Sequence, residues 1–250
     1  MSRPPACWAA VAALVCVALL ATSCVDDPRE GARPQGARGP ASSSTATVEA
    51  TADNATELTD EQLIGAVRGA VVRVRQTSCR SVAVGSGFLF DADTFVTNRH
   101  VVDGGGLIEL LSWDGRDIKV RSARTSVTAD LAYLEATPPP GFASIPLRAS
   151  RLSPGERVAV IGFPEGGPLA VSTGVVDGYE HGLAGDSPEV LKATVVVKHG
   201  NSGGPVLDMT GRLVGVIFAE KIRTDEALII PIEQALRSSS GALAPIDPPC

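Results

Sequence analysis

The sequence predicts an all-β fold built from two antiparallel barrels of short strands. Aromatic residues make up 4% of the 250 residues, whereas there are 26 glycines and 18 prolines. Short valine-rich runs alternate with turns containing Gly, Pro or Asp, which is typical of barrels rich in hairpins. Pro138-Pro139-Pro140-Gly141 interrupts this series. We therefore expect a boundary between this segment and Pro154, with an N-barrel at about 70–137 and a C-barrel at about 154–230.

The first elements follow an export signal and a polar segment. Residues 1–24 carry one charge, Arg3, and an apolar run that ends in small residues, as in a signal peptide. Leu20-Ala21-Thr22-Ser23-Cys24 resembles the lipobox of bacterial lipoproteins, which implies lipidation of Cys24. An uncleaved single-span anchor and plain secretion are the alternatives, and all three place the protein outside the cytoplasm. Residues 25–57 lack large apolar groups and are expected to form a disordered tether.

The segment 58–250 is expected to form the folded domain. Thr59-Asp60-Glu61-Gln62 is a capping box, which predicts a short helix. Trp113-Asp114-Gly115-Arg116 is a hairpin turn between two strands. Asp130 falls inside the last strand of the first set. The strands expected there are Val71–Arg75, Val82–Phe90, Thr94–Thr97, Leu107–Leu111, Asp117–Arg121 and Val127–Leu134.

A second set of strands and a final helix follow the proline-rich segment. Pro231 to Ser238 is expected to be helical, because proline suits the first turn of a helix. About 180 ordered residues suffice for two small cores. The strands expected in this half are Arg157–Phe163, Leu169–Asp177, Val190–Val197, Val206–Leu207, Leu213–Phe218 and Ala227–Ile230.

Cysteine usage agrees with export. Of the five cysteines, Cys7 and Cys16 would leave with the signal peptide and Cys24 would carry lipid. Cys79 and Cys250 remain, and an oxidising compartment favours a disulfide between them. Two free thiols are the alternative.

The candidate nucleophile is Ser202, within Gly200-Asn201-Ser202-Gly203-Gly204-Pro205. Glycines let the backbone approach closely, so that consecutive N–H groups can converge on one point beside the hydroxyl. A plain hairpin turn is the alternative. The same residues satisfy the G-x-S-x-G nucleophile elbow of α/β-hydrolases, but that fold places its histidine after the serine. All three histidines of this chain precede Ser202, which excludes that arrangement.

His100 and Asp130 are the candidate base and orienting acid. The order His, Asp, Ser matches the chymotrypsin-like arrangement. A carboxylate among the apolar neighbours of Asp130 needs a partner, and the imidazole of His100 would supply one. Asp103 and Asp117 compete with Asp130 but lie in polar, turn-like segments. His181 is expected in a solvated loop, and His199 at the rim of the site.

Five motifs stand out in the chain, namely Gly85-Ser86-Gly87-Phe88, Thr97-Asn98-Arg99-His100-Val101-Val102, Asp130-Leu131-Ala132, Gly162-Phe163-Pro164 and the Gly200–Pro205 segment. Together they resemble the motifs of trypsin-like serine peptidases, most closely the bacterial HtrA/DegP-type protease domain and membrane-tethered actinobacterial relatives. The resemblance covers about residues 60–238. It implies two perpendicular six-stranded barrels, a catalytic triad in the cleft between them, and an oxyanion hole formed by the N–H groups of Gly200 and Ser202. HtrA proteases carry PDZ domains, and we expect none here because about 12 residues follow the last helix.

The resemblance also points to a substrate pocket. Val196 stands six residues before the serine, where digestive relatives place the base of the S1 pocket, and Gly215, Val216 and Ile217 would form a wall. No acid is available there to bind Lys or Arg. We therefore expect small or medium apolar P1 residues.

The sequence thus predicts an exported, membrane-tethered serine endopeptidase that acts on proteins or peptides without a metal or other cofactor. The net charge of −6 and the absence of a Lys/Arg cluster argue against nucleic-acid binding. A catalytically silent binding module on the same scaffold, or an esterase with the same triad, is the alternative.

Overall fold

The computed structural model describes residues 56–79, 81–181, 188–221 and 226–246. The signal peptide, Cys24, Cys250 and all but the last two residues of the predicted tether lie outside these ranges. Cys79 takes part in a disulfide, and its pairing with Cys250 stays a prediction. No helix in the described ranges has the length and apolarity needed to cross a bilayer.

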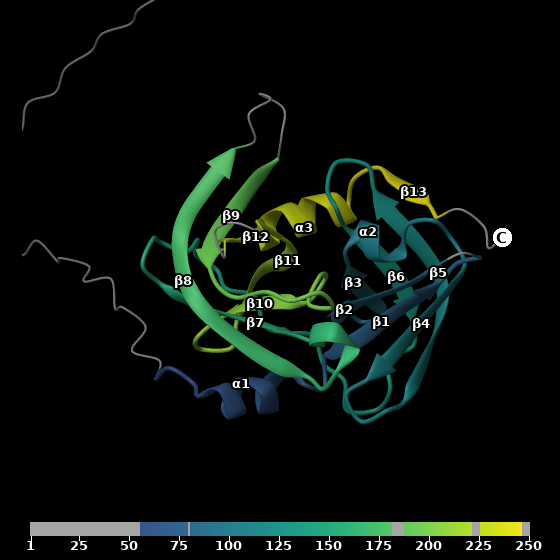
Figure 1. Ribbon diagram of the computed structural model, residues 1–250, viewed down its shortest axis with the longest axis horizontal. Coiled ribbons are helices and arrows are strands. Elements are labelled where there is room, and N and C mark those ends of the chain that lie inside the picture. Colours follow the sequence, from purple (N-terminus) through teal and green to yellow (C-terminus); the bar gives the residue numbers. More distant parts are fainter. Residues whose placement is uncertain (1–55, 80, 182–187, 222–225, 247–250) are drawn as a thin grey trace, which may run out of the picture. The chain divides into compact units, whose positions relative to one another are not determined.

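The first six strands form a closed antiparallel barrel (Figure 1). Strands pair around the ring in the order β1, β2, β3, β6, β5, β4. The hairpin turn predicted at residues 113–116 joins β4 to β5, and Gly115 has φ of 83° there. The bounds are β1 Val71–Thr77, β2 Val82–Asp91, β3 Thr94–Thr97, β4 Leu107–Ser112, β5 Asp117–Ser126 and β6 Ala132–Ala136.

The next six strands form a second closed barrel with the same connectivity. The ring order is β7, β8, β9, β12, β11, β10, which repeats the order of the first barrel strand for strand. The fold is therefore the expected pair of six-stranded antiparallel barrels. The bounds are β7 Arg157–Gly162, β8 Ala170–His181, β9 Glu189–Thr194, β10 Pro205–Asp208, β11 Leu213–Lys221 and β12 Glu226–Pro231.

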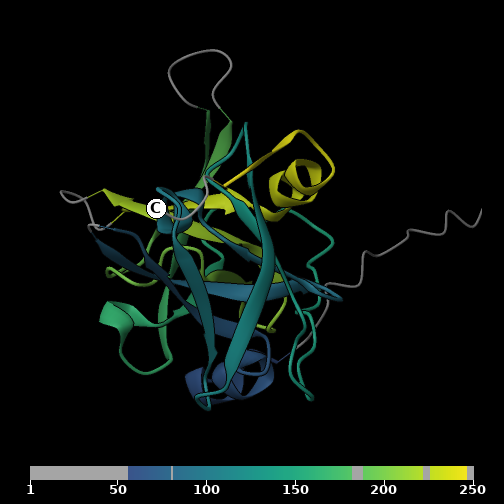
Figure 2. The same ribbon diagram turned by 90° about the vertical axis from the view of Figure 1, so that its right-hand side faces the viewer.

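Two helices flank the barrels. Helix α1 (Asp60–Val67) begins at the predicted capping box, in which Thr59 and Gln62 exchange backbone and side-chain hydrogen bonds. Helix α3 (Ile232–Ser239) begins directly after Pro231. Figures 1 and 2 show α1 at the lower side of the barrels and α3 in the upper part. The short strand β13 (Leu243–Pro245) pairs with β5 and was not predicted.

Three apolar clusters stabilise this arrangement. One fills the N-barrel and includes Phe95 and Leu110, and a second fills the C-barrel and includes Leu191. The third joins residues of both barrels with both flanking helices, for example Phe88 and Ile161. Burial of apolar surface is the main favourable term in folding, so this shared cluster holds the two barrels together.

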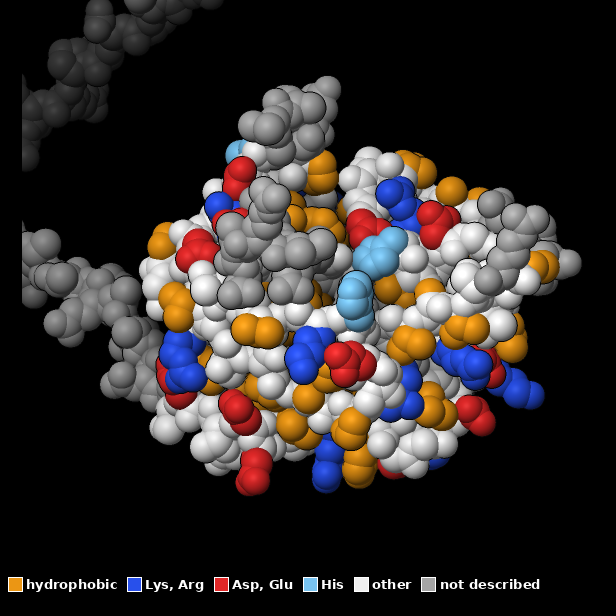
Figure 3. All heavy atoms as spheres, viewed as in Figure 1, with side chains coloured by type: hydrophobic (Ala, Val, Ile, Leu, Met, Phe, Trp, Pro, Cys, Tyr) orange, Lys and Arg blue, Asp and Glu red, His pale blue; other side chains and the backbone are white. Residues whose placement is uncertain are grey.

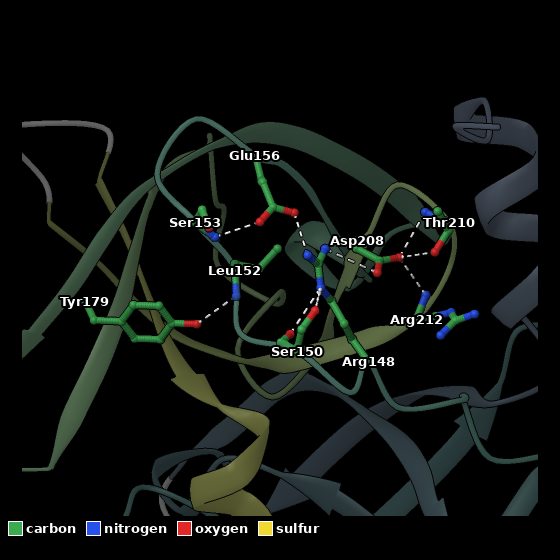
Figure 4. Close-up of polar contacts among 9 residues, drawn as sticks. All are labelled: Arg148, Ser150, Leu152, Ser153, Glu156, Tyr179, Asp208, Thr210 and Arg212. Carbon is green, nitrogen blue, oxygen red and sulfur yellow. Dashed lines mark hydrogen bonds and ion pairs between the residues drawn. The ribbon is translucent and has the colours of Figure 1, made fainter. Parts of the chain in front are cut away.

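The connector between β6 and β7 is fixed to the C-barrel by Arg148 (Figure 4). Its guanidinium forms ion pairs with Glu156 at 2.7 Å and with the buried Asp208 at 3.5 Å. Asp208 also accepts hydrogen bonds from Thr210 and from the backbone N–H of Arg212. The connector is therefore an ordered part of the domain.

The strand predicted at Val127–Leu134 is wrong in its first part, and the strand predicted at Val190–Val197 is shorter than expected, because β9 ends at Thr194. Residues 127–131 are not part of a strand: β5 continues to Ser126, and β6 begins only at Ala132. Asp130 accordingly lies in the loop between these strands. The hydroxyl of Ser126 accepts hydrogen bonds from the N–H groups of Thr128 and Ala129. Such a local turn competes with a β-ladder for the same backbone groups.

Candidate active site

His100 lies on a one-turn helix, α2 (Arg99–Val102), which follows β3. The helix is fixed from below by Val101 and Val102, which are buried in the N-barrel core. The buried Asn98 precedes it and donates a side-chain hydrogen bond to the carbonyl of Asp130 at 2.9 Å. This hydrogen bond connects the start of the helix to the loop that carries Asp130, independently of the contacts of the imidazole.

The carboxylate of Asp130 binds His100 twice. Its Oδ2 lies 2.6 Å from Nδ1 of the imidazole, and its Oδ1 accepts the backbone N–H of His100 at 3.0 Å. The imidazole is 48% exposed, whereas the Asp130 side chain is 23% exposed. With its proton on Nδ1, facing Asp130, the imidazole has Nε2 available to a second partner. A serine nucleophile requires this tautomer of the histidine.

The surroundings keep Asp130 ionised. Burial acts to raise the pKa of its carboxyl, but the hydrogen bonds and charge of His100 and the nearby charge of Arg99 outweigh burial. The pKa therefore lies below its ordinary value of 3.8. An ionised carboxylate can hold the imidazole in position and stabilise the imidazolium that forms when it accepts a proton.

Ser202 lies in the loop between β9 and β10, on the other barrel. The next residue, Gly203, has φ of 85°, and its N–H donates to the carbonyl of Ile217 at 2.8 Å. A Cβ at this position would lie 2.3 Å from both the Ser86 carbonyl oxygen and Oγ1 of Thr97. Only glycine fits there, which explains the glycine that follows the candidate nucleophile.

Gly200 and Ser202 are the residues predicted to form the oxyanion hole. Gly200 has φ of 92°, in the region that favours glycine. Among the described residues, the backbone N–H groups of Gly200 and Ser202 donate to no backbone carbonyl, whereas the N–H of Asn201 between them donates to Lys198. Two donors on one loop are therefore available to a ligand.

A cavity of about 410 Å³ adjoins several of the candidate residues. His100, Gly200 and Ser202 line it, as does His199. Figure 3 shows one face of the molecule, with histidine side chains at its surface. Val82 and Val84 of β2 and Glu165 also line the cavity, and they were not predicted as site residues. Nothing in the local sequence distinguishes a strand valine that faces a cleft from any other strand valine.

The competing residues lie elsewhere. Asp103 is exposed at the end of α2, and Asp117 is the exposed first residue of β5. His181 ends β8, where its Nε2 lies 3.6 Å from Glu189. Within the described ranges, no three His, Cys, Asp or Glu side chains form a group that could hold a metal ion.

The predicted wall of the substrate pocket needs correction. The side chains of Val216 and Ile217 are fully buried, one in the cluster shared by the barrels and the other inside the C-barrel. Gly215 packs against Ile229 and the backbone of Ile230. These residues alternate between two interior faces of β11 and present no side chain to a ligand. Val196 is 56% exposed.

Farther along β11, Phe218 lines a second cavity. This cavity has a volume of about 270 Å³, and Arg99 and Asp130 line it as well. It therefore adjoins the loop that carries the candidate orienting acid.

Comparisons with known proteins agree with this geometry. A model of the trypsin-like peptidase domain matches residues 85–216. A probable periplasmic serine endoprotease, DegP-like, from Bartonella henselae is 32% identical over 145 residues, which are 57% of this chain and 29% of the relative. Serine protease Rv3671c from Mycobacterium tuberculosis is 28% identical over 180 residues, which are 66% of this chain and 44% of the relative. The chain thus spans less than half the length of these relatives.

The fold agrees as well. The crystal structure of the active form of the Rv3671c protease from M. tuberculosis aligns with a TM-score of 0.65 at 24% identity, covering 74% of this chain and 86% of that one. The protein belongs to the trypsin-like peptidase domain family. Its matched relatives include serine proteases of the HtrA/DegP type.

Proposed function

We propose that the protein is a serine endopeptidase with His100, Asp130 and Ser202 as its catalytic triad. The observation that carries the proposal is the double contact between Asp130 and His100, made beside a cavity that His100 shares with Ser202. The two barrels supply different members, since His100 and Asp130 lie in the first and Ser202 in the second.

The reaction follows from these positions. Nε2 of His100 accepts the proton of the Ser202 hydroxyl while Oγ attacks the carbonyl carbon of the scissile bond. The resulting tetrahedral intermediate collapses, and the leaving amine takes the proton from the imidazolium. Water, activated by the same imidazole, then hydrolyses the acyl-enzyme and regenerates the free serine.

The N–H groups of Gly200 and Ser202 would stabilise the negative oxygen of both tetrahedral intermediates. Removal of one such donor in enzymes of this type costs about 10²–10³ in kcat. The available N–H groups and the positive φ of Gly200 support this role.

We also propose that the enzyme acts outside the cytoplasm, tethered through lipid on Cys24. The relatives named periplasmic and the residues of the lipobox support this. In cell fractionation, the full chain should sediment with membranes, and Cys24→Ala should move to the soluble fraction. Equal sedimentation of both forms would contradict lipidation.

The activity is tested by incubating the mature protein with casein and with a small ester substrate. The parent should cleave both, and Ser202→Ala should lose about 10⁴–10⁶ in kcat. We expect cleavage of casein after small or medium apolar residues. Hydrolysis of the ester alone would favour an esterase, and inertness of a folded parent would favour a binding module. Equal cleavage by parent and variant would exclude Ser202 as the nucleophile.

A further inference from the structure

Ser86, the central residue of the Gly85-Ser86-Gly87 motif, is a buried hydrogen-bonding centre between the barrels. It is fully buried in β2. Its N–H donates to the carbonyl of Ser202 at 2.8 Å, and its own carbonyl accepts from Oγ1 of Thr97 at 2.7 Å. Its hydroxyl donates to the carbonyl of Gly200 at 2.6 Å and accepts from the N–H of Phe163 at 2.9 Å.

Three of these four bonds reach the second barrel, although Ser86 belongs to the first. Two of them hold the carbonyls of Gly200 and Ser202, two residues that line the cavity. The space around the hydroxyl is tight, because a Cβ on Gly162 would lie 2.7 Å from Oγ of Ser86. Close packing therefore adds to the two hydrogen bonds that hold the hydroxyl against the nucleophile loop.

Through the bond from Phe163, Ser86 also contacts the turn that packs against the nucleophile loop at His199. Phe163 begins a turn that contains the one-turn helix η1 (Pro164–Gly166). The N–H of Glu165 in this turn donates to the carbonyl of His199 at 2.6 Å. Among the described residues, Glu165 is the one non-glycine with positive φ, at 56°. Such backbone strain persists where surrounding contacts enforce it.

The side chain of Arg73 braces the same turn. Its Nη2 donates to the carbonyl of Gly167 at 2.6 Å, and its guanidinium lies 4.9 Å from the centre of the Phe163 ring. The first barrel thus holds the turn at its beginning through Ser86 and at its end through Arg73.

These contacts orient one peptide bond. The carbonyl of His199 points to Glu165, and in a trans peptide the following N–H, that of Gly200, points the opposite way. Gly200 has little conformational preference of its own, so external bonds must fix this peptide. The two carbonyls on either side of the Gly200 N–H are held by Glu165 and by the Ser86 hydroxyl.

We propose that Ser86 is a positioning residue that orients the oxyanion hole of Gly200 and Ser202 through these bonds. The inference rests on the proposed function, because it assigns Ser86 a part in the same reaction. Ser86 touches no substrate; it acts through the carbonyls of the nucleophile loop and through the Phe163 turn.

The test compares Ser86→Ala with Ser112→Ala in the mature protein. Ser112 is a matched control, since it is a buried serine of the same barrel whose hydroxyl contacts Asp114 and Arg116 instead of the site. Readouts are kcat and KM per active site, counted by fluorophosphonate titration, and the Ki of a peptide boronate that mimics the tetrahedral intermediate.

Ser86→Ala should lower kcat by about 10- to 100-fold and raise the boronate Ki by a similar factor, as expected for misplaced oxyanion donors. KM should change less than about threefold, because ground-state contacts remain. Ser112→Ala should leave all three values within about twofold, as expected of a serine whose bonds reach no group of the site. Should Ser86→Ala fail to fold, Ser86→Cys keeps a weak donor in a similar volume and should give intermediate values.

Unchanged kcat and Ki per active site in Ser86→Ala, or in a folded Ser86→Cys if Ser86→Ala fails to fold, would overturn the proposal. So would a fall in the number of titratable sites with normal turnover at each, since that indicates a purely structural role. An inert parent would instead overturn the proposed function, and the inference with it.

Discussion

At the scale of single residues, the carboxylate of Asp130 makes two contacts with His100, one through each oxygen. Its Oδ2 holds the ring of His100, and its Oδ1 holds the backbone of the same residue. The second contact fixes the position of α2, and the first fixes the tautomer of the imidazole. An amide in its place keeps the shape but offers a neutral group.

Asp130→Asn should therefore lower kcat by about 10³–10⁴ at neutral pH with a small change in KM. It should also alter acid stability. The folded-state pKa of Asp130 lies below 3.8, so its ionised form stabilises the fold above that pH. This contribution is lost as the pH falls through the lower, folded-state value. The parent should lose unfolding free energy more steeply than the variant below pH 3.8.

Kinetics at pH 7 and denaturant titrations from pH 6 to pH 2 would check both expectations, with Asp103→Asn as the control. Asp103 is exposed at the end of α2, whereas the carboxylate that bonds to the imidazole is that of Asp130. Equal kcat for the parent and Asp130→Asn would contradict the role of the carboxylate. Parallel acid profiles would contradict its ionised state.

At the scale of elements, the strands of both barrels could be predicted because alternating apolar runs and turns are local signals. The helix at Thr59 was equally readable, since both partners of its capping box lie within four residues. The structure departs from expectation where a side chain competes with the strand for backbone N–H groups. Residues 127–131 form a loop because the Ser126 hydroxyl captures two backbone N–H groups.

The candidate site shows the same division. The residue types and order of His100, Asp130 and Ser202 could be read from the sequence, because each type is suited to one step of the chemistry. The wall of the substrate pocket could not be predicted from the sequence. Val216 packs in the cluster shared by the barrels and Ile217 inside the C-barrel, and this becomes known only with the strand register of the barrel. Ser86 stood in a recognised motif, but its four bonds connect segments up to 116 residues apart.

At the scale of the whole molecule, the site exists only where two barrels of identical strand order meet. One barrel provides His100 and Asp130, the other provides Ser202, and Ser86 connects the two. The apolar cluster shared by the barrels holds them in this arrangement. We propose that these parts together activate the hydroxyl of Ser202.

The most direct measurement is labelling of the native protein with a fluorophosphonate, followed by peptide mapping by mass spectrometry. We expect one adduct on Ser202 in the parent and no labelling in Ser202→Ala. In His100→Ala labelling should be slower by about 10³-fold or more, because an unassisted serine hydroxyl is a weak nucleophile. An unlabelled native parent, or an adduct on Ser202 that forms equally fast without the imidazole, would contradict it.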